Sequence, residues 1–378
     1  MKLEGVRVLD LSLFLPGPHL TTMMGDHGAE IIKIEPPGEG EPVRHVGYRA
    51  GGQSVWFRNI ARGKHSIVLD LKSQAGRDAF LALADQADVV VEAFRPGVVT
   101  RLGIDYDAVS ARNPRIVYAS IAAFGQSGPL KMRPAHDIGM EALAGVLSLN
   151  LDHSGRPVHP HMPIADITGS MMALAGVLMA LLRREKTGRG DYVDISMHDA
   201  TLSWLPNATG SVFAENRPPV VPEERSWGGH SFYNIYDTAD GRQIVLCAVE
   251  HKFVNNLLTA VGRADLIAMA HQPPGPAHAP VKAALADIFR TRTRDEWERW
   301  MQDHDVCLAP VLDLHEAFHH PQAAAREMLI RDAEGNLHIG NPIKFRHEPA
   351  RINPALPGYG EHTEAVLARL APGHRARD

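Results

Sequence analysis

The feature that most constrains the fold of this chain is the alternation of short apolar runs with amphipathic segments over its first 120 residues. Segments with the helical pattern, 19–30 and 75–87, lie between runs rich in Val and Ile. The runs expected as buried strands are 6–11 (VRVLDL), 31–35 (IIKIE), 65–71 (HSIVLDL), 88–94 (DVVVEAF) and 115–121 (RIVYASI). This rhythm is typical of βαβ units, in which helices cover a parallel sheet. We therefore expect an α/β fold with a Rossmann-like large domain.

The pattern of apolar and polar residues changes in the second half of the sequence. One more strand is expected at 192–197 (YVDISM), and the paired prolines of 212–229 indicate a linker. Hairpin character around Asp240-Gly241 and a helical pattern at 295–306 then predict a smaller α+β domain. We expect residues 1–211 to form the first part of the large domain, 212–229 a linker, 230–318 the small domain, and 319–378 a return to the large domain.

Composition excludes several classes of protein. With 378 residues, of which 44% are hydrophobic, the chain can bury substantial cores, and its net charge of -5 gives no reason to expect a nucleic-acid or anionic-membrane partner. The two cysteines, Cys247 and Cys307, cannot form a disulfide framework, so a reducing cytoplasmic location is expected. The N-terminus lacks the pattern of a signal peptide. The apolar run 171–182 is too short to cross ~30 Å of hydrocarbon.

The turn after the first expected strand argues against a dinucleotide cofactor. It reads SLFLPGPH rather than GxGxxG, and proline lacks the amide donor that a pyrophosphate loop needs. Neither GxxxxGK[ST] nor GxSxG occurs, so P-loop hydrolysis and elbow-serine hydrolysis have no support.

Four acid-base side chains stand in unusual local settings. His136 and Asp137 precede the apolar run 138–149, Asp166 lies at the start of another apolar segment, and Glu250 ends the expected strand QIVLCAVE. Taken singly, each has a structural interpretation, because Asp137 and Asp166 could cap helices, His136 could be a rim histidine and Glu250 a strand-end charge. Asp166 also has a chemical one, since the positive end of a helix dipole would hold its carboxylate ionised.

Ordered segments along nearly the whole chain resemble the family III CoA-transferases and their relatives, the α-methylacyl-CoA racemases. These segments are LEGVRVLDLS, LPGPHLTTMMGDHGAEIIKIEPPGEGEPVR, RGKHSIVLDLKSQAG, VVVEAFRPGVVTRLGIDY, FGQSGP, KTGRGDYVDISMHDA and YDTADGRQIVL. The resemblance implies a Rossmann-like large domain built from both ends of the chain, a small domain between them, and a homodimer whose two chains are interlocked.

Both branches of this superfamily have an aspartate at the position of Asp166. The resemblance implies that it is a nucleophile taking the acyl group as a mixed anhydride in a transferase, or one of two bases flanking the α-carbon of a thioester in a racemase. His136 in AHDI matches the racemase GHDINY-type motif, and Glu250 in AVEHKF matches the racemase AIEPQF-type glutamate, supplied by the partner chain. Leu15 replaces the glutamine expected of a formyl-CoA transferase.

Two positions depart from the pattern of the superfamily. Met162 stands where racemases often have asparagine, and Pro36 replaces a CoA-contacting arginine. These changes bear on the orientation of Asp166 and on one phosphate contact.

The chemistry that these residues support is a two-base racemisation of an acyl-CoA. One base removes the α-proton to give an enolate and the other returns a proton to the opposite face. His136 and Asp166 are the expected bases, Glu250 is expected to orient the imidazole, and amides near Asp166 could stabilise the enolate oxygen. The alternative is a CoA-transferase in which Asp166 attacks the thioester.

No cofactor beyond the CoA of the substrate is expected, and no metal. His159 and His161 are separated and followed by prolines, which rules out ligation from successive turns of a helix. Candidates for the CoA phosphates are basic residues, since charge-assisted hydrogen bonds from Lys and Arg suit phosphate. They are Lys33, Arg62, Lys64, Arg95 and Arg101, with the strand-edge segment of Leu69, Leu71 and Lys72 resembling the adenine-binding segment of the superfamily.

Overall fold

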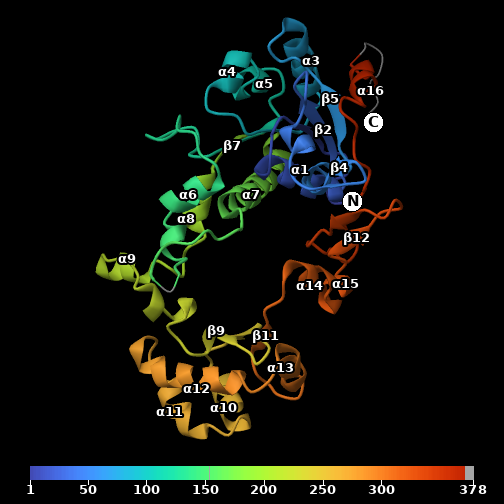
Figure 1. Cartoon of the computed structure of the whole chain (residues 1–378). Helices are drawn as coiled ribbons and strands as arrows, with labels where there is room; N and C mark the ends of the chain where they lie inside the picture. Colours follow the sequence, from blue (N-terminus) through green and yellow to red (C-terminus); the bar gives the residue numbers. More distant parts are fainter. Residues whose placement is uncertain (153, 371–378) are drawn as a thin grey trace. The chain divides into compact units, whose positions relative to one another are not determined.

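The computed structural model describes residues 1–152 and 154–370, and its contacts divide the chain into two compact units (Figure 1). Unit 1 comprises Met1–Val146, His159–Trp204 and the chain from His319 onward. Unit 2 comprises Leu147–Val158 and Leu205–Phe318. The domain boundaries expected from the sequence stay a prediction. Within the expected linker, the structure has the end of a short helix and two 3₁₀ turns.

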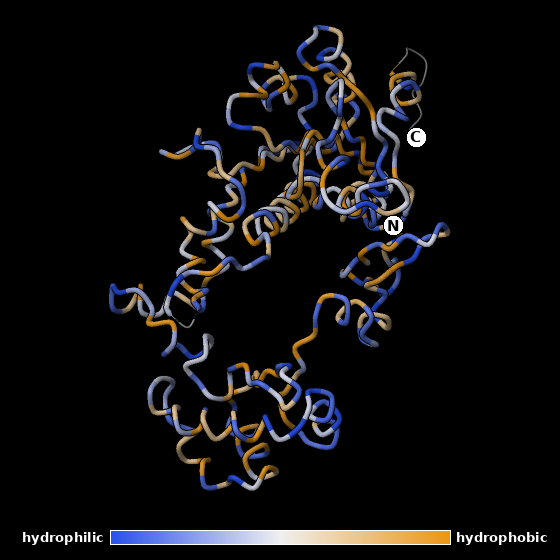
Figure 2. Tube along the Cα trace, in the orientation of Figure 1, coloured by the Kyte–Doolittle hydropathy of each residue, from blue (hydrophilic) through white to orange (hydrophobic). Residues whose placement is uncertain are grey.

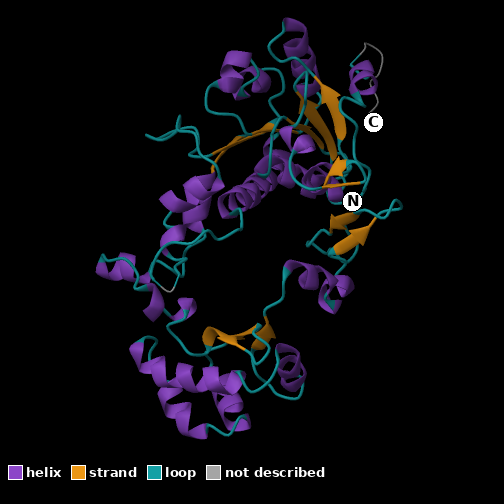
Figure 3. Ribbon diagram, viewed as in Figure 1, coloured by secondary structure: helices purple, strands orange, loops and turns teal. Residues whose placement is uncertain are grey.

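Unit 1 is built on a six-stranded sheet in which every neighbouring pair is parallel (Figure 3). The strand order is β5-β2-β1-β6-β7-β8. The strands are β1 (Arg7–Asp10), β2 (Glu30–Glu35), β5 (His65–Val68), β6 (Val89–Glu92), β7 (Val117–Ala122) and β8 (Tyr192–Ser196). The expected α/β class with a parallel sheet is confirmed, and the order matches the doubly wound arrangement in which the chain turns back at β1.

Helices connect successive strands of this sheet and flank it (Figure 1). The longer ones are α1 (Pro16–Asp26), α2 (Val55–Ala61), α3 (Gln74–Ala84), α6 (Asp137–Leu143), α7 (Ile164–Thr187) and α8 (Met197–Ser203). Shorter elements are η1 (Pro42–His45), β3 (Arg49–Ala50), β4 (Gln53–Ser54), α4 (Val98–Leu102) and α5 (Tyr106–Ser110). After His319 come α15 (Pro321–Ala325), β12 (Leu329–Arg331), β13 (Leu337–Ile339) and α16 (Thr363–Ala368).

Apolar side chains of the strands pack on both faces of the sheet. Val8 belongs to one buried cluster and Leu9 to another, because successive side chains of a strand point to opposite faces. Leu20 of α1 and Val177 of α7 pack in the first cluster, whereas Phe80 of α3 packs in the second. Val366 of α16 joins the second cluster, so the C-terminal segment completes the core of unit 1.

Helix α7 is longer than the apolar run suggested. It has 24 residues and an apolar window that satisfies a membrane-span test by length and composition. One side of it packs on the sheet through Ala173, Leu174 and Val177, and Figure 2 draws much of this helix in shades from white to orange. The apolar helix therefore extends beyond the run 171–182, and burial in the core accounts for only part of its composition, because Met179 and Leu182 are 65% and 70% exposed.

Unit 2 combines a small antiparallel sheet with helices. The order β11-β10-β9 joins β9 (Tyr233–Asp237), β10 (Gln243–Cys247) and β11 (Leu308–Pro310), and the expected hairpin turns at Asp240 and Gly241. The other elements are η2 (Val146–Ser148), which begins in unit 1, α9 (Gly210–Glu215), η3 (Val221–Glu223), η4 (Arg225–Trp227), α10 (His251–Ala260), η5 (Ala264–Leu266), α11 (Ile267–Ala270), η6 (Pro276–His278), α12 (Ala279–Phe289), α13 (Arg294–Met301) and α14 (Leu314–His319), which ends in unit 1. Trp297 closes the core and donates to the Phe289 carbonyl at 2.9 Å.

Candidate active site

A cavity of unit 1 lies at the carboxyl edge of the parallel sheet. It has a volume of about 590 Å³, and its walls come from the ends of four strands and from α4: Leu11, Leu13, Ile34, Glu35, Pro36, Pro37, Leu69, Asp70, Leu71, Lys72, Phe94, Val98, Arg101 and Leu102. Strands β1 and β6 are neighbours there although the chain leaves them toward opposite edges of the sheet. Ligands of doubly wound sheets bind at this kind of switch point.

The cavity brings together some of the residues expected to bind CoA. Leu69, Leu71 and Lys72 line one wall, and Arg101 lines another. Arg95 is exposed and is absent from the lining. Pro36 also lies on the wall, at the position where the resemblance implies an arginine. Lys72 and Arg101 are therefore the cations that the structure leaves available at this cavity.

Three other expected cations are buried ion pairs of the core. Lys33 Nζ lies 2.8 Å from Glu41 Oε2, Lys64 Nζ 3.0 Å from Asp10 Oδ2, and Arg62 Nη2 2.8 Å from Asp26 Oδ2. The side chains of Lys33, Lys64 and Arg62 are only 2%, 0% and 4% exposed. Moving such a cation to a ligand would leave its partner carboxylate buried and unpaired, which costs about 3–5 kcal/mol. We therefore correct their expected role from phosphate binding to stabilisation of unit 1.

Three carboxylates meet where α6 contacts the first turn of α7. The backbone amide of Asp166 donates to Asp137 Oδ1 at 3.0 Å, and that of Ile164 donates to Glu141 Oε1 at 3.3 Å. Asp137 and Glu141 thus cap α7 from the neighbouring helix, because the first amides of a helix have no partner within it. These two amides are already engaged, which speaks against their expected use as donors to an enolate oxygen.

The environment of Asp166 differs from the sequence-based expectation. Burial, followed by the nearby charge of Asp137, raises the pKa of Asp166 to about 7. Burial and Asp137 likewise raise the pKa of Glu141 to about 7. This direction is opposite to the expectation that the helix dipole holds Asp166 ionised, because desolvation and a like charge both favour the protonated carboxyl group. A carboxyl group that titrates near neutrality can both accept and donate a proton.

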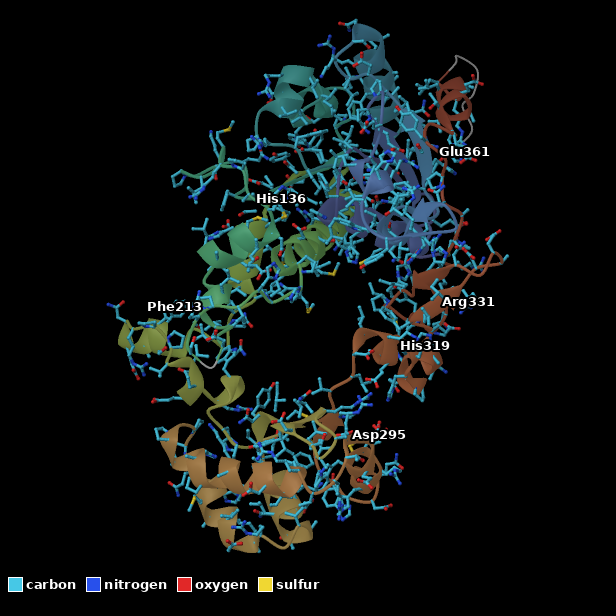
Figure 4. The ribbon with its side chains drawn as sticks, in the orientation of Figure 1. His136, Phe213, Asp295, His319, Arg331 and Glu361 are labelled. Atoms are coloured by element: carbon cyan, nitrogen blue, oxygen red, sulfur yellow. The ribbon has the colours of Figure 1, made fainter. Side chains whose placement is uncertain are left out.

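His136 lies in the segment that enters α6, where Figure 4 labels it. It occupies the N-cap position, but its side chain makes no capping hydrogen bond and is exposed. Its ring contacts Phe14 edge to face, with centroids 6.3 Å apart and planes at 90°. Asp137, the next residue, binds the Asp166 amide, so the backbone that carries His136 is tied to the start of α7. Asp137 therefore caps α7, whereas the His136 imidazole makes no capping hydrogen bond to α6.

Sequence reasoning missed two features of this site. Glu141 is fully buried, and the visible signal was a carboxylate inside the otherwise apolar run 138–149. His19, in the first turn of α1, forms a hydrogen bond between its Nδ1 and Ser170 Oγ at 2.9 Å. Ser170 lies one helical turn after Asp166 in α7. Burial, with Lys64 and Arg62, lowers the pKa of His19, so its ring is neutral near pH 7. This pair links α1 to α7 one helical turn after Asp166.

The remaining predicted residue, Glu250, belongs to unit 2. It is exposed at the N-cap of α10, and its backbone carbonyl accepts from the amides of Phe253 and Val254. Its side chain makes no capping hydrogen bond. Within unit 2 it is a carboxylate facing solvent. The expectation that Glu250 of the partner chain orients the His136 imidazole stays a prediction.

Known proteins resemble this chain over nearly all of its length. The sequence matches the family described as CoA-transferase family III over residues 3–363. It is 34% identical over 377 residues to an acetyl-CoA:oxalate CoA-transferase of Acetobacter aceti, covering 97% of this chain and 95% of that protein. It is 32% identical over 379 residues to the alpha-methylacyl-CoA racemase of Homo sapiens, covering 97% and 93%. The crystal structure of a CAIB/BAIF family protein from Brucella suis matches with a TM-score of 0.85 at 27% identity, covering 97% and 99%.

Proposed function

Because the chain belongs to CoA-transferase family III, whose members include CoA-transferases and racemases, we propose that it is an acyl-CoA racemase of the α-methylacyl type. The observation that carries this proposal is the environment of Asp166. Its pKa of about 7 lets the carboxyl group take a proton in one direction of the reaction and return it in the other. His136, on the segment tied to Asp166, supplies the second base, since histidine is the residue type suited to proton transfer near neutral pH.

In the proposed reaction, one base removes the proton from the α-carbon and the electron pair delocalises onto the thioester oxygen. The other base then protonates the opposite face of the enolate, which inverts the centre and leaves the two bases in exchanged protonation states. The proposal includes an interlocked dimer in which Glu250 of the partner subunit orients His136. It also places the CoA moiety in the switch-point cavity, against Lys72 and Arg101.

A second function has its own support. Carboxylates of Asp and Glu serve as nucleophiles in covalent catalysis, and the 34% identical relative is named as a CoA-transferase. In that reaction Asp166 attacks the thioester carbonyl, CoA leaves as its thiolate, and the acyl group stays on the aspartate as a mixed anhydride. The thiolate next attacks the Asp166 carbonyl of this anhydride, which releases the first acid and leaves CoA on Asp166 as a thioester. The acceptor carboxylate attacks that thioester, which forms a second mixed anhydride and frees the thiolate again. Attack of the thiolate on the acyl carbonyl of the acceptor then gives the new acyl-CoA and restores the Asp166 carboxylate.

Incubation with a 2-methylacyl-CoA in D₂O separates the two functions. For a racemase we expect deuterium at the α-carbon with no acceptor acid present, because enolate return takes its proton from a base that exchanges with solvent. Mass spectrometry reads the added deuterium, and chiral separation of the released acid reads inversion. A wild-type protein without α-exchange that forms a hydroxylamine-sensitive acyl adduct on Asp166 contradicts the racemase proposal and supports the transferase.

The pH dependence of the reaction should respond to Asp137. We expect Asp137→Asn to lower the pKa of Asp166, because it removes the neighbouring negative charge while its amide oxygen can still accept from the Asp166 backbone. Burial persists, so the acid limb of the rate governed by ionised Asp166 should move to lower pH by only about one unit. The measurement is kcat/KM between pH 5 and 9.

The matched control is Asp78→Asn, which removes one exposed charge from α3. It should leave the acid limb in place. If the acid limb of the kcat/KM profile does not move in Asp137→Asn, then Asp137 does not raise the pKa of the group that governs the rate.

A further inference from the structure

The turn between β1 and α1 contains a residue in an unusual backbone conformation. Phe14 has φ of 63°, in the left-handed region that residues with a Cβ rarely adopt. It immediately precedes Leu15, the N-cap of α1. Such conformations persist only where surrounding contacts impose them, and they cluster at functional sites.

The contacts that impose this conformation come from one buried ion pair. Glu41 Oε1 accepts from the Phe14 amide at 3.0 Å, and Glu41 Oε2 lies 2.8 Å from Lys33 Nζ. Lys33 Nζ also donates to the Ser12 carbonyl at 2.5 Å. The side chains of Glu41 and Lys33 are 0% and 2% exposed. The ion pair therefore fixes the turn at two points, Ser12 and Phe14.

The same turn approaches the first turn of α1 closely. A Cβ added at Gly17 would lie 2.1 Å from Ser12 Oγ, so the turn and the helix are in closest contact there. Ser12 is itself fixed, because its amide donates to Asp10 Oδ1 at 3.0 Å. Phe14 thus projects from a rigid turn although its side chain is exposed, with 40% of its surface accessible.

The ring that this turn presents contacts the ring of His136 at 90°. Within residues 1–152 and 154–370, the His136 imidazole makes no hydrogen bond or ion pair, and its ring packs edge to face against Phe14. We propose that Phe14 is a positioning residue, which holds the His136 imidazole in the orientation needed for proton transfer at one face of the α-carbon. This inference rests on the proposed racemase function. It adds that the strained turn carrying Phe14, which the Lys33–Glu41 pair anchors, positions the second base.

The test compares Phe14→Ala with Phe14→Tyr in the racemisation of both enantiomers of a 2-methylacyl-CoA in D₂O. We expect Phe14→Ala to lower kcat for racemisation about tenfold with KM within about twofold, because misplacing a base costs rate more than binding. Exchange with retention should persist for the enantiomer whose proton faces Asp166 and should fall for the other. Phe14→Tyr keeps the ring and should restore most of the rate.

Two further variants separate the ring from the backbone strain. Phe14→Gly removes the ring and relieves the left-handed strain, so we expect it to be as slow as Phe14→Ala but to melt at a higher temperature. Glu327→Gly is the matched control, because Glu327 is also left-handed, with φ of 53°, and lies in a loop outside the site. It should raise the melting temperature without changing the rate.

The outcomes distinguish this inference from the function on which it rests. A wild-type protein without α-exchange overturns both. A wild-type protein that exchanges, with Phe14→Ala losing exchange equally for both enantiomers or losing none, overturns the positioning role alone. Full recovery of the racemisation rate in Phe14→Gly also overturns the positioning role, since the loss of rate in Phe14→Ala would then come from the backbone and not from the missing ring.

Discussion

We expect Asp166→Asn to lower the rate of α-proton exchange by about three orders of magnitude or more. Asparagine can neither accept nor donate the proton in question, and a positioned acid-base group contributes about 10²–10⁴ in rate. Exchange should be lost first for the enantiomer whose α-proton faces Asp166. The measurement is deuterium incorporation from D₂O into each enantiomer of a 2-methylacyl-CoA.

The same substitution should stabilise the folded protein at alkaline pH. The pKa of Asp166 is raised to about 7 in the folded state. Between the ordinary pKa of an aspartate and pH 7, this carboxyl group therefore binds fewer protons in the unfolded chain than in the folded protein. Folded stability from this group is therefore lost as pH rises through that window. The partly buried asparagine side chain of the variant has no charge to desolvate, and we expect a gain on the order of 2 kcal/mol at pH 8.

Thermal unfolding at pH 5 and pH 8 provides the control for this prediction. The gain should be present at pH 8 and much smaller at pH 5, where Asp166 is protonated in the folded state. An inactive variant that is less stable than wild type at pH 8 would point to misfolding rather than to a lost base. Activity retained within tenfold would remove Asp166 from the chemistry of both candidate reactions.

The second large effect on the rate of racemisation is expected from substitution of His136. His136→Ala should lower racemisation by about two to four orders of magnitude, because the proton on one face of the α-carbon then has no base. Asp166 remains, so exchange with retention should continue for the enantiomer whose proton faces it. That asymmetry distinguishes the loss of one base from a general loss of activity.

His136→Ala also separates the two candidate reactions, which Asp166→Asn cannot do. In the transferase mechanism the nucleophile is intact, so transfer of CoA to a carboxylate acceptor should persist in this variant. His45→Ala, an exposed histidine of η1, is the matched control and should behave as wild type in both assays. Persistent racemisation in His136→Ala would remove the second base from the proposal.

The secondary structure of unit 1 could be predicted because its signals are local. The run IIKIE predicted a strand and lies in β2, while the segment 75–87 predicted a helix and overlaps α3. Helix α1 begins earlier than expected, at Pro16, since proline is well accommodated in the first turn of a helix. The hairpin at Asp240-Gly241 followed from turn chemistry, with Gly241 at φ of 73°.

The candidate site was only partly predictable for a different reason. His136 and Asp166 stand in recognisable motifs, and the structure ties their backbones together through Asp137. Lys33, Arg62 and Lys64 were misassigned, because sequence shows that a residue is basic but not whether a carboxylate from another part of the chain pairs with it in the core.

The sequence by itself determined the periodicity of the elements, the βαβ order and the residue types at the site, since these depend on neighbours along the chain. Only the tertiary structure decided the protonation behaviour of Asp166 and the orientation of the Phe14 ring. Both depend on distance and burial between segments more than 25 residues apart, Asp137 with Asp166 and Glu41 with Phe14. Desolvation and Coulomb energy are functions of three-dimensional separation, which no local pattern of residues records.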